Sequence, residues 1–349
     1  MKKSWTYKKA GVDRDAAKSF HDIAIRKIRS ISNALNLNVL GIEEGRFTNY
    51  VQLGDYKLTL HADGVGTKVL VAQLMNRYWE VGWDAVAMNV NDLVAGGAKP
   101  LGIVDYIALE KSDKEILEGL LDGIEKACIE SKTALIGGET AIMPDVIKGI
   151  KPGKGFDVSV AALGIVLWNV QKGSYGDVII GFRSNGIHSN GLSLARKILL
   201  SKFDVNDPAP YDSSVTIGEE LLRPTRIYVK ICVKLWEKNL VKNFAHITGG
   251  AFLKIRRILE TNSGVEINVP DPPDIFKLII TKGNVPWDET YKTFNMGIGM
   301  VAITTKDLAE EVIRLCKKMG YEADIIGKVD KEPGIRINVP GIGMVRIQC

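Results

Sequence analysis

A strand-like run leads into a cluster of groups suited to binding phosphate. Residues 56–60 alternate apolar and polar side chains as a strand does, and "DGVGTK" follows at 63–68. The motif supplies a carboxylate, a hydroxyl, an ammonium and two glycines, on Asp63, Thr67, Lys68, Gly64 and Gly66. It lacks the glycine spacing and the Gly-Lys-Ser/Thr ending of a Walker A loop. Two interpretations therefore stand at this point: a phosphate site, or a plain glycine turn with a capping aspartate.

Three further acidic residues have apolar or glycine neighbours. Asp92 stands in "VNDLV", Asp105 in "VDY", and Glu139 in "GGET", where Gly138 and Thr140 flank it. Burying such a carboxylate is costly unless a cation compensates. Mg²⁺ binds through a few carboxylates together with substrate phosphates. We therefore interpret Asp63, Asp92, Asp105 and Glu139 as candidate magnesium ligands, although each alone could be a helix cap or a turn residue.

The second half of the chain carries two loops rich in small polar residues. "SNGIHSNGLSLARK" spans 184–197 and "HITGGAF" spans 246–252, and each precedes an expected helix. Backbone N–H groups at a helix start favour an anion, so two such loops suggest a phosphate ester as a second ligand, although either loop could be a simple helix cap. Among the four histidines, His188 has the most hydrogen-bonding neighbours and is our candidate acid–base or charge-stabilising residue.

The expected elements place these motifs at strand ends and helix starts. Strands are predicted at 58–61, 101–108, 133–136 and 158–167, and helices at 21–35, 79–93 and 113–132. The second half is predicted to begin with the strand "DVIIGF", followed by helices at 192–203 and 228–240, a helix opened by "HITGG", and strands at 296–304 and 335–339. The chain turns polar and glycine-bearing at 171–176. We therefore predict an α/β protein with domains at 1–170 and 171–349.

Composition excludes several classes of protein. The chain has 349 residues, 46 basic and 41 acidic, so its net charge of +5 is mild and no dense Lys/Arg block indicates nucleic-acid binding. No apolar run is long enough to span a bilayer, and the N-terminus lacks the apolar core of a secretory signal. Four scattered cysteines without a CxxC pair suit a reducing cytoplasm. We expect a cytoplasmic protein without a membrane partner.

An ordered set of motifs resembles the AIR synthase family, that of the phosphoribosylformylglycinamidine cyclo-ligases. The matching segments run through nearly the whole chain: "YKKAGVDRDA" at 7–16, "DGVGTK" at 63–68, "VNDLVAGGAKPLGIVDY" at 90–106, "GGETAIMP" at 137–144, "SNGIHSNGLSLARKIL" at 184–199, "PTRIYVK" at 224–230, "HITGGAF" at 246–252 and "TFNMGIGM" at 293–300. No single segment is specific, but the ordered set is.

The resemblance implies an enzyme that uses ATP and Mg²⁺ to close the imidazole ring of aminoimidazole ribonucleotide from formylglycinamidine ribonucleotide. It implies two α/β domains, with N-terminal sheets that pair across a homodimer into a barrel and an active site completed between subunits. Mapped by motif, the nucleotide and metal side comprises Asp63, Gly64, Gly66, Thr67, Lys68, Asp92, Asp105, Gly138, Glu139 and Thr140. The substrate side comprises Ser184, Asn185, His188, Ser189, Asn190, Thr248, Gly249, Gly250 and Asn295. His188, Lys68 and Asp92 would be catalytic.

One segment departs from the family pattern. Bacterial members carry a glycine-rich stretch before "DGVGTK", whereas 41–50 here reads "GIEEGRFTNY", which leaves the covering of the nucleotide open.

Alternatives within the same superfamily are selenide water dikinase, thiamine-monophosphate kinase and a hydrogenase-maturation dehydratase. The dehydratase uses a C-terminal cysteine, and this chain ends in Cys349, but "HSNGLSLARK" and "PTRIYVK" are not expected there. A selenide water dikinase needs a reactive residue near the N-terminus, and the first cysteine is Cys128. A nucleotide-binding scaffold without turnover would not need Lys68, Asp92 and His188 together.

Overall fold

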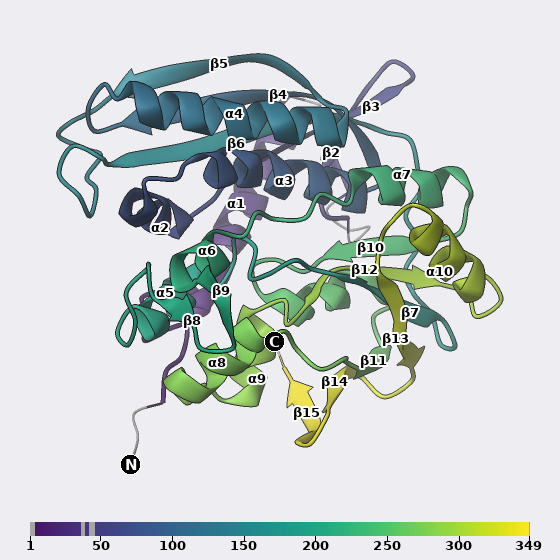
Figure 1. Cartoon of the computed structure of the whole chain (residues 1–349). Coiled ribbons are helices and arrows are strands. Elements are labelled where there is room, and N and C mark those ends of the chain that lie inside the picture. Colours follow the sequence, from purple (N-terminus) through teal and green to yellow (C-terminus); the bar gives the residue numbers. More distant parts are fainter. Residues whose placement is uncertain (1–3, 36–38, 42–45, 349) are drawn as a thin grey trace.

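Two mixed β-sheets, one in each half of the chain, form the framework of the molecule (Figure 1). The computed structural model describes residues 4–35, 39–41 and 46–348. The first sheet has the strand order β1-β2-β3-β6-β4-β5, and only its β4–β5 pair is parallel. The second has the order β10-β12-β7-β13-β11-β14-β15, in which β11 and β14 are parallel. A further sheet consists of the two short strands β8 and β9, and the chain is thus an α/β protein, as predicted.

The elements of the first half are α1 (Arg14–Leu35), β1 (Val39–Leu40), β2 (Tyr50–Leu53), β3 (Tyr56–Gly64), α2 (Lys68–Met75), α3 (Trp79–Ala95), β4 (Ala98–Leu109), α4 (Lys114–Ser131), β5 (Ala134–Ile142) and β6 (Phe156–Val166). Those of the second half are β7 (Val178–Arg183), α5 (Leu192–Leu199), β8 (Pro208–Ala209), β9 (Asp212–Thr216), α6 (Ile217–Leu222), α7 (Val229–Glu237), β10 (Asn243–His246), η1 (Ala251–Ile258), β11 (Gly264–Asn268), α8 (Asp274–Gly283), α9 (Trp287–Thr293), β12 (Ile298–Thr304), α10 (Ala309–Lys318), β13 (Ala323–Asp330), β14 (Gly334–Val339) and β15 (Gly343–Ile347).

Helix α3 lies between the two halves, because it packs on the first sheet and also contacts α7 and β10 of the second half. Most of its residues are buried, which is expected for a helix that is apolar on nearly every side. It ends where Gly97 takes a φ of 77°, so the predicted break at the two glycines is confirmed. Three of its polar side chains, Asp84, Asn91 and Asp92, contact the second half of the chain rather than solvent.

Helix α4 covers the same face of the first sheet as α3 (Figure 1). Its predicted start is confirmed, because the Asp113 carboxylate caps it by accepting a hydrogen bond from the Ile116 N–H at 3.2 Å. In the part of the chain that the structure describes, the opposite face of this sheet is left exposed. We call it the open face, and its exposed large apolar residues include Leu60, Val104, Tyr106 and Ile136.

Several predicted bounds were wrong, in each case at a motif. Strand β3 continues through Asp63 and Gly64, and β5 continues through the "GGET" segment, so these residues lie within strands rather than after them. The helix after "HITGG" is a 3-10 helix, η1. Pairing with neighbouring strands extends β3 and β5 beyond what local patterning indicates.

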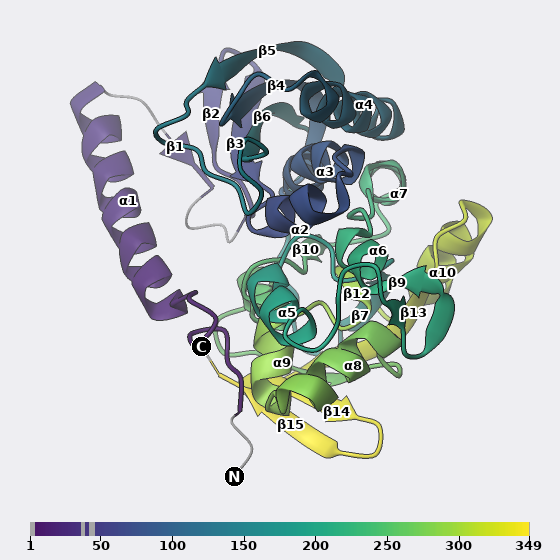
Figure 2. The ribbon, with the colours of Figure 1, turned by 60° about the vertical axis from the view of Figure 1, so that its left-hand side comes forward.

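The N-terminal segment, residues 4–13, packs on the second half although we predicted it in the first domain. The Trp5 N–H donates to the Gly283 carbonyl at 3.1 Å, the Tyr7 N–H donates to Glu289 Oε1 at 2.9 Å, and the Lys197 ammonium donates to the Ala10 carbonyl at 2.7 Å. Helix α1 then runs along the side of the molecule to the first sheet (Figure 2). The first residues of the chain therefore bridge its two halves.

No helix in the described ranges has the length and apolar character needed to cross a membrane. Cys128, Cys232 and Cys316 are buried free thiols. The C-terminal Cys349, raised above as an alternative acceptor, lies outside the described residues, as does the middle of the divergent 41–50 segment.

Candidate functional site

A cavity of about 250 Å³ lies where the two predicted motif groups meet. We call it the interdomain pocket. It is lined by Tyr7, Val12, Asp63, Gly64, Val65, Gly66, Thr67, Met88, Ser189, Asn190, Leu192 and Ser193. The first half thus supplies the "DGVGTK" turn, the second half supplies the "HSNGLS" loop, and the N-terminal segment supplies a third wall.

Two helices begin at this pocket. The turn between β3 and α2 needs a left-handed residue, and Gly66 supplies it with a φ of 60°. Gly191, at 82°, does the same before α5. The pocket-lining Thr67 and Ser193 flank these two helix starts, and their hydroxyl oxygens are 2.9 Å apart. The positive ends of two helix dipoles therefore converge on one cavity, an arrangement that suits an anion.

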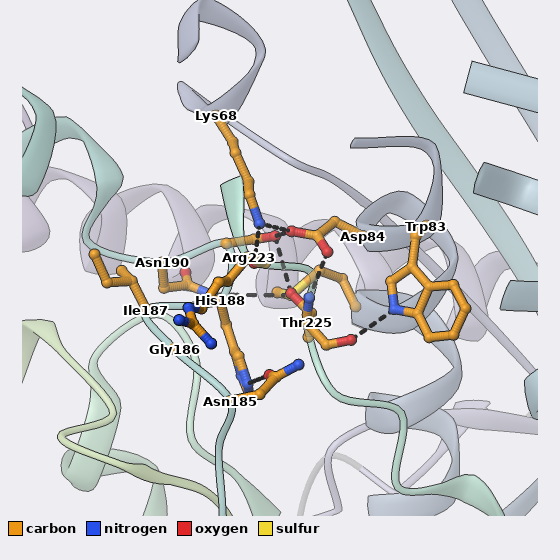
Figure 3. Close-up of polar contacts among 12 residues, drawn as sticks. Lys68, Trp83, Asp84, Asn185, Gly186, Ile187, His188, Asn190, Arg223 and Thr225 are labelled. Atoms are coloured by element: carbon orange, nitrogen blue, oxygen red, sulfur yellow. Dashed lines mark hydrogen bonds and ion pairs between the residues drawn. The ribbon is translucent and has the colours of Figure 1, made fainter. Parts of the chain in front are cut away.

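Lys68 does not point into this pocket. Its side chain is fully buried, and its ammonium donates to Asp84 Oδ2 at 2.5 Å and to the Arg223 carbonyl at 2.6 Å (Figure 3). We predicted this lysine at the nucleotide phosphates from its place in the motif. In the ligand-free chain its charge is instead neutralised by Asp84.

Asp92 lies at the centre of a buried cluster between the halves. His246 Nδ1 is 2.6 Å from one of its oxygens and His61 Nε2 is 3.2 Å from the other. Burial alone would raise the pKa of Asp92, but the hydrogen bonds from His246 and His61 outweigh it and hold that pKa well below its usual range. Both carboxylate oxygens are thus occupied by imidazoles in this conformation.

The four candidate magnesium ligands are not brought together within one chain. Asp105 lies on the helix-covered face of the first sheet, over Gly138, whereas Glu139 pairs with Tyr106 and so lies on the open face. Thr140 is on the edge strand β5. Over residues 4–35, 39–41 and 46–348, no group of three or more His, Cys, Asp or Glu side chains could hold a metal ion. Asp63 is the candidate that lines the pocket.

His188 lies behind the pocket rather than in its wall. It is 3% exposed, its Nε2 is 2.9 Å from Asn185 Oδ1, and its Nδ1 is buried without a hydrogen-bond partner among the described residues (Figure 3). Burial, followed by the positive charges of His246, Lys68 and Arg226, holds the pKa of His188 well below 6.5. The ring is therefore neutral at neutral pH, with one unsatisfied nitrogen.

The remaining substrate-side candidates divide into two groups. Asn190 lines the pocket, and a Cβ added at Gly249 would lie 3.3 Å from Asn190 Oδ1, so the loop of Thr248, Gly249 and Gly250 reaches the same place. Asn295 instead holds the histidine loop, because its amide donates to the Gly186 and Ile187 carbonyls and its Oδ1 accepts from the Ser184 hydroxyl at 2.9 Å. Ser184 and Asn295 thus shape the loop from behind.

Sequence reasoning missed several residues of this region. Tyr7, Val12 and Met88 line the pocket without any polar signature that marks them. The sequence does mark Asp84 as unusual, since it is a single acid inside the apolar run "VGWDAVAM". It belongs to none of the glycine motifs described above. His61 stands two residues before the first motif, and the structure gives it a partner in Asp92.

Both halves of the chain match models of AIR synthase related proteins. The N-terminal domain model matches residues 48–166 and the C-terminal domain model matches residues 174–340. Among solved structures, the HypE–HypF complex aligns with a TM-score of 0.63 at 18% identity over 92% of this chain and 98% of that one. AaThiL complexed with AMPPCP and TMP aligns with a TM-score of 0.60 at 18% identity, over 90% and 94%. At these identities the likeness shows the fold alone.

Curated relatives are much closer. The phosphoribosylformylglycinamidine cyclo-ligase of Sulfurisphaera tokodaii is 43% identical over 336 residues, which is 95% of this chain and 96% of the relative. The protein of the same name from Methanocaldococcus jannaschii is 42% identical over 93% and 92% of the two chains, and that of Thermococcus kodakarensis is 39% identical over 97% and 99%. With both domain models matched and the relatives covered almost from end to end, the chain belongs to the phosphoribosylformylglycinamidine cyclo-ligase family of AIR synthase related proteins.

Proposed function

We propose that this protein closes the imidazole ring of aminoimidazole ribonucleotide from formylglycinamidine ribonucleotide, with ATP converted to ADP and phosphate. The observation that carries the proposal is the interdomain pocket, in which two helix starts and the loops of both halves face one cavity. Both substrates are phosphorylated, and the pocket offers N–H donors to such groups. Family membership supplies the reaction.

The proposed chemistry begins with transfer of the terminal phosphoryl group of ATP to the formyl oxygen of the substrate. The amidine nitrogen then attacks the formyl carbon, the bond between this carbon and the phosphorylated oxygen breaks, and phosphate leaves. The chain contributes by holding both phosphorylated ligands, through the N–H groups at the starts of α2 and α5 and the hydroxyls of Thr67 and Ser193. Fixing the two ligands side by side lowers the entropic barrier to both steps.

One feature of the interdomain pocket suits a magnesium ion, namely a carboxylate at its wall. Asp63 presents a carboxylate at its wall, and Mg²⁺ commonly binds through one or two carboxylates plus substrate phosphates, without a cage made by the protein alone. When bound, the ion would neutralise charge on the transferring phosphoryl group. We propose Asp63 as its ligand. Asp92, Asp105 and Glu139, which do not line the pocket, stay predictions as further ligands.

The substrate side is proposed to comprise Asn190, Ser189 and the loop of Thr248, Gly249 and Gly250. His188 supports this side from behind, because its neutral ring contacts Asn185 and leaves a buried nitrogen without a hydrogen-bond partner among the described residues. A catalytic role for His188, Lys68 and Asp92 stays a prediction. We retain a cytoplasmic location as the expectation from composition.

We propose that the working form is a homodimer paired through the open face. Leu60 is 71% exposed and Ile136 is 64% exposed, and Val104 and Tyr106 adjoin them on the same face. Exposed apolar patches of this kind mark contact surfaces, and a second copy presents a complementary sheet. Glu139 lies on this face, so a second copy would also approach the "GGET" segment.

The direct test measures ADP release from the purified protein with Mg²⁺ and ATP, with and without formylglycinamidine ribonucleotide, together with a colour assay for the aromatic amine product. Substrate-dependent ADP with an equal amount of amine supports the proposal. ADP without amine points to a kinase of the same fold. The absence of both ADP and amine, from a protein that is a folded dimer, would overturn the proposal.

The matched variants for this test are Asp63→Asn and Asp55→Asn. Asp55 is an exposed residue in the turn between β2 and β3, away from the pocket. Asp63→Asn should raise the Mg²⁺ concentration needed for half-maximal rate, whereas Asp55→Asn should not.

A further inference from the structure

Asp84 is a fully buried carboxylate on α3 that the proposed chemistry does not use. Its Oδ2 accepts from the Lys68 ammonium at 2.5 Å and from the Ser189 hydroxyl at 2.7 Å. Its Oδ1 accepts from the Thr225 N–H at 2.6 Å. One side chain of the first half therefore binds two separate segments of the second half and the helix start of its own half (Figure 3).

The partners of Asp84 adjoin the interdomain pocket on two sides. Lys68 directly follows Thr67, which lines the pocket at the start of α2, and Ser189 itself lines the opposite wall. Secondary contacts strengthen the arrangement. The Lys68 ammonium also donates to the Arg223 carbonyl at 2.6 Å, and the Trp83 indole N–H donates to the Thr225 carbonyl at 2.7 Å.

We propose that Asp84 is a positioning residue that sets the separation of the two walls of the interdomain pocket. Charge-assisted hydrogen bonds in a buried site are strong and directional, and three of them converge on this carboxylate. Because one wall belongs to each half of the chain, loosening the carboxylate's contacts lets the walls shift relative to each other. The affinity for both ligands then falls, although Asp84 touches neither.

The matched pair of variants is Asp84→Asn and Asp177→Asn. Asp177 is also a buried carboxylate with an ammonium partner, Lys242, at 2.8 Å, but it lies in the second half and does not line the interdomain pocket. Asp84→Asn leaves the fully buried Lys68 ammonium without a counter-ion, and Asp177→Asn does the same to the partly exposed Lys242 ammonium, so both should lower the melting temperature. Of the two variants, only Asp84→Asn should also change substrate binding.

The kinetic test rests on the proposed function and compares KM with kcat. A purely structural defect lowers the concentration of folded enzyme, so it lowers the apparent kcat and leaves KM unchanged. Shifted walls weaken binding, and we expect Asp84→Asn to raise KM for formylglycinamidine ribonucleotide by about ten-fold or more, with Asp177→Asn unchanged. An unchanged KM in Asp84→Asn would overturn the inference.

Hydrogen exchange provides a readout that needs no turnover. In Asp84→Asn, amides of 184–191 and of 223–226 should exchange faster than in the wild type, while those of β11 and β14 stay protected. If the wild type makes no amine product, the proposed function fails, and the exchange pattern still tests Asp84. Exchange in these two segments equal to that of Asp177→Asn would overturn the inference.

If Asp84→Asn does not fold, the double variant Asp84→Asn with Lys68→Met removes both buried charges and carries the same test. Replacing both members of a buried ion pair is usually tolerated better than removing one. The double variant should regain the melting temperature but keep the raised KM and the fast exchange at 184–191, a segment that Asp84 binds through Ser189 and that Lys68 does not contact directly. A KM that returns to the wild-type value together with stability would show that only the unpaired charge mattered, and would overturn the inference.

Discussion

Leu60 is the most exposed of the four open-face residues, and its replacement by lysine tests the proposed homodimer most directly. The side chain is 71% exposed in the single chain. Burying a whole leucine side chain is worth about 1.5–3 kcal/mol, so covering the exposed part is worth about 1–2 kcal/mol per copy. In a two-fold dimer the change occurs twice, which gives about 2–4 kcal/mol.

This free energy corresponds to a rise in the dimer dissociation constant of roughly 30-fold to 1,000-fold, since about 1.4 kcal/mol is a factor of ten. Lysine adds the cost of desolvating its charge, so the estimate is a lower bound. Sedimentation velocity over a range of protein concentrations measures the dissociation constant. Because the site is proposed to need both chains, specific activity should fall with dissociation and recover at high protein concentration.

The matched control is Ile129→Lys. Ile129 is 70% exposed, nearly the same as Leu60, but it lies on α4, on the covered side of the sheet. The control should leave the dissociation constant unchanged. A Leu60→Lys protein with the wild-type constant, or equal weakening by both variants, would refute the assignment of the open face.

Three other predictions concern the pocket and the residues behind it. Gly66→Val should weaken ATP binding by about ten-fold or more in calorimetry, because a β-branched residue does not adopt its φ of 60°. The control Gly54→Val, with a φ of 58° in the β2–β3 turn, should cost stability without changing ATP binding. The depressed pKa of His188 means that below pH 6.5 the unfolded chain takes up a proton that the folded chain refuses, so this residue lowers the free energy of unfolding as pH falls. His188→Asn should therefore flatten the loss of stability between pH 6.5 and 5 in urea titrations, and a slope equal to that of the wild type would contradict this. Asp92→Asn should lower stability most at neutral pH, because the depressed pKa of Asp92 contributes stability that is present above the unfolded pKa of about 4 and is lost as pH falls. Equal loss at pH 3 and pH 7 would argue against the His61 and His246 contacts.

Local sequence patterns predicted the parts of the fold that local forces determine. Helix α4 is one such part, because its cap, its amphipathic spacing and its left-handed end at Lys132 all lie within one segment. The glycines of the pocket are another, since Gly66 and Gly191 take left-handed conformations that other residues rarely adopt. The chemistry of each motif group predicted an anion site in each half, and the structure brings the two groups to one cavity.

The direction of individual side chains could not be predicted in this way. Lys68 stands in the motif as if it faced a phosphate, and its orientation depends on Asp84 and on the carbonyl of Arg223, 155 residues away. His188 likewise owes its neutral state to burial between the halves. Such contacts depend on the packing of distant segments, and no local pattern encodes them. Curated relatives establish the family, and these side-chain placements are what the structure adds.

Helix α3 has a consequence for how the chain folds. Besides Asp84 and Asp92, it carries Asn91, whose amide donates to the Arg226 carbonyl and whose oxygen accepts from the Tyr228 N–H, each at 2.9 Å. The first half made alone would expose these groups beside the apolar surface that the second half covers. The first half should therefore fold stably only when the second half packs on it. We expect the whole chain to melt in one cooperative calorimetric transition. A protein built in this way has two large sheets but a single folding unit.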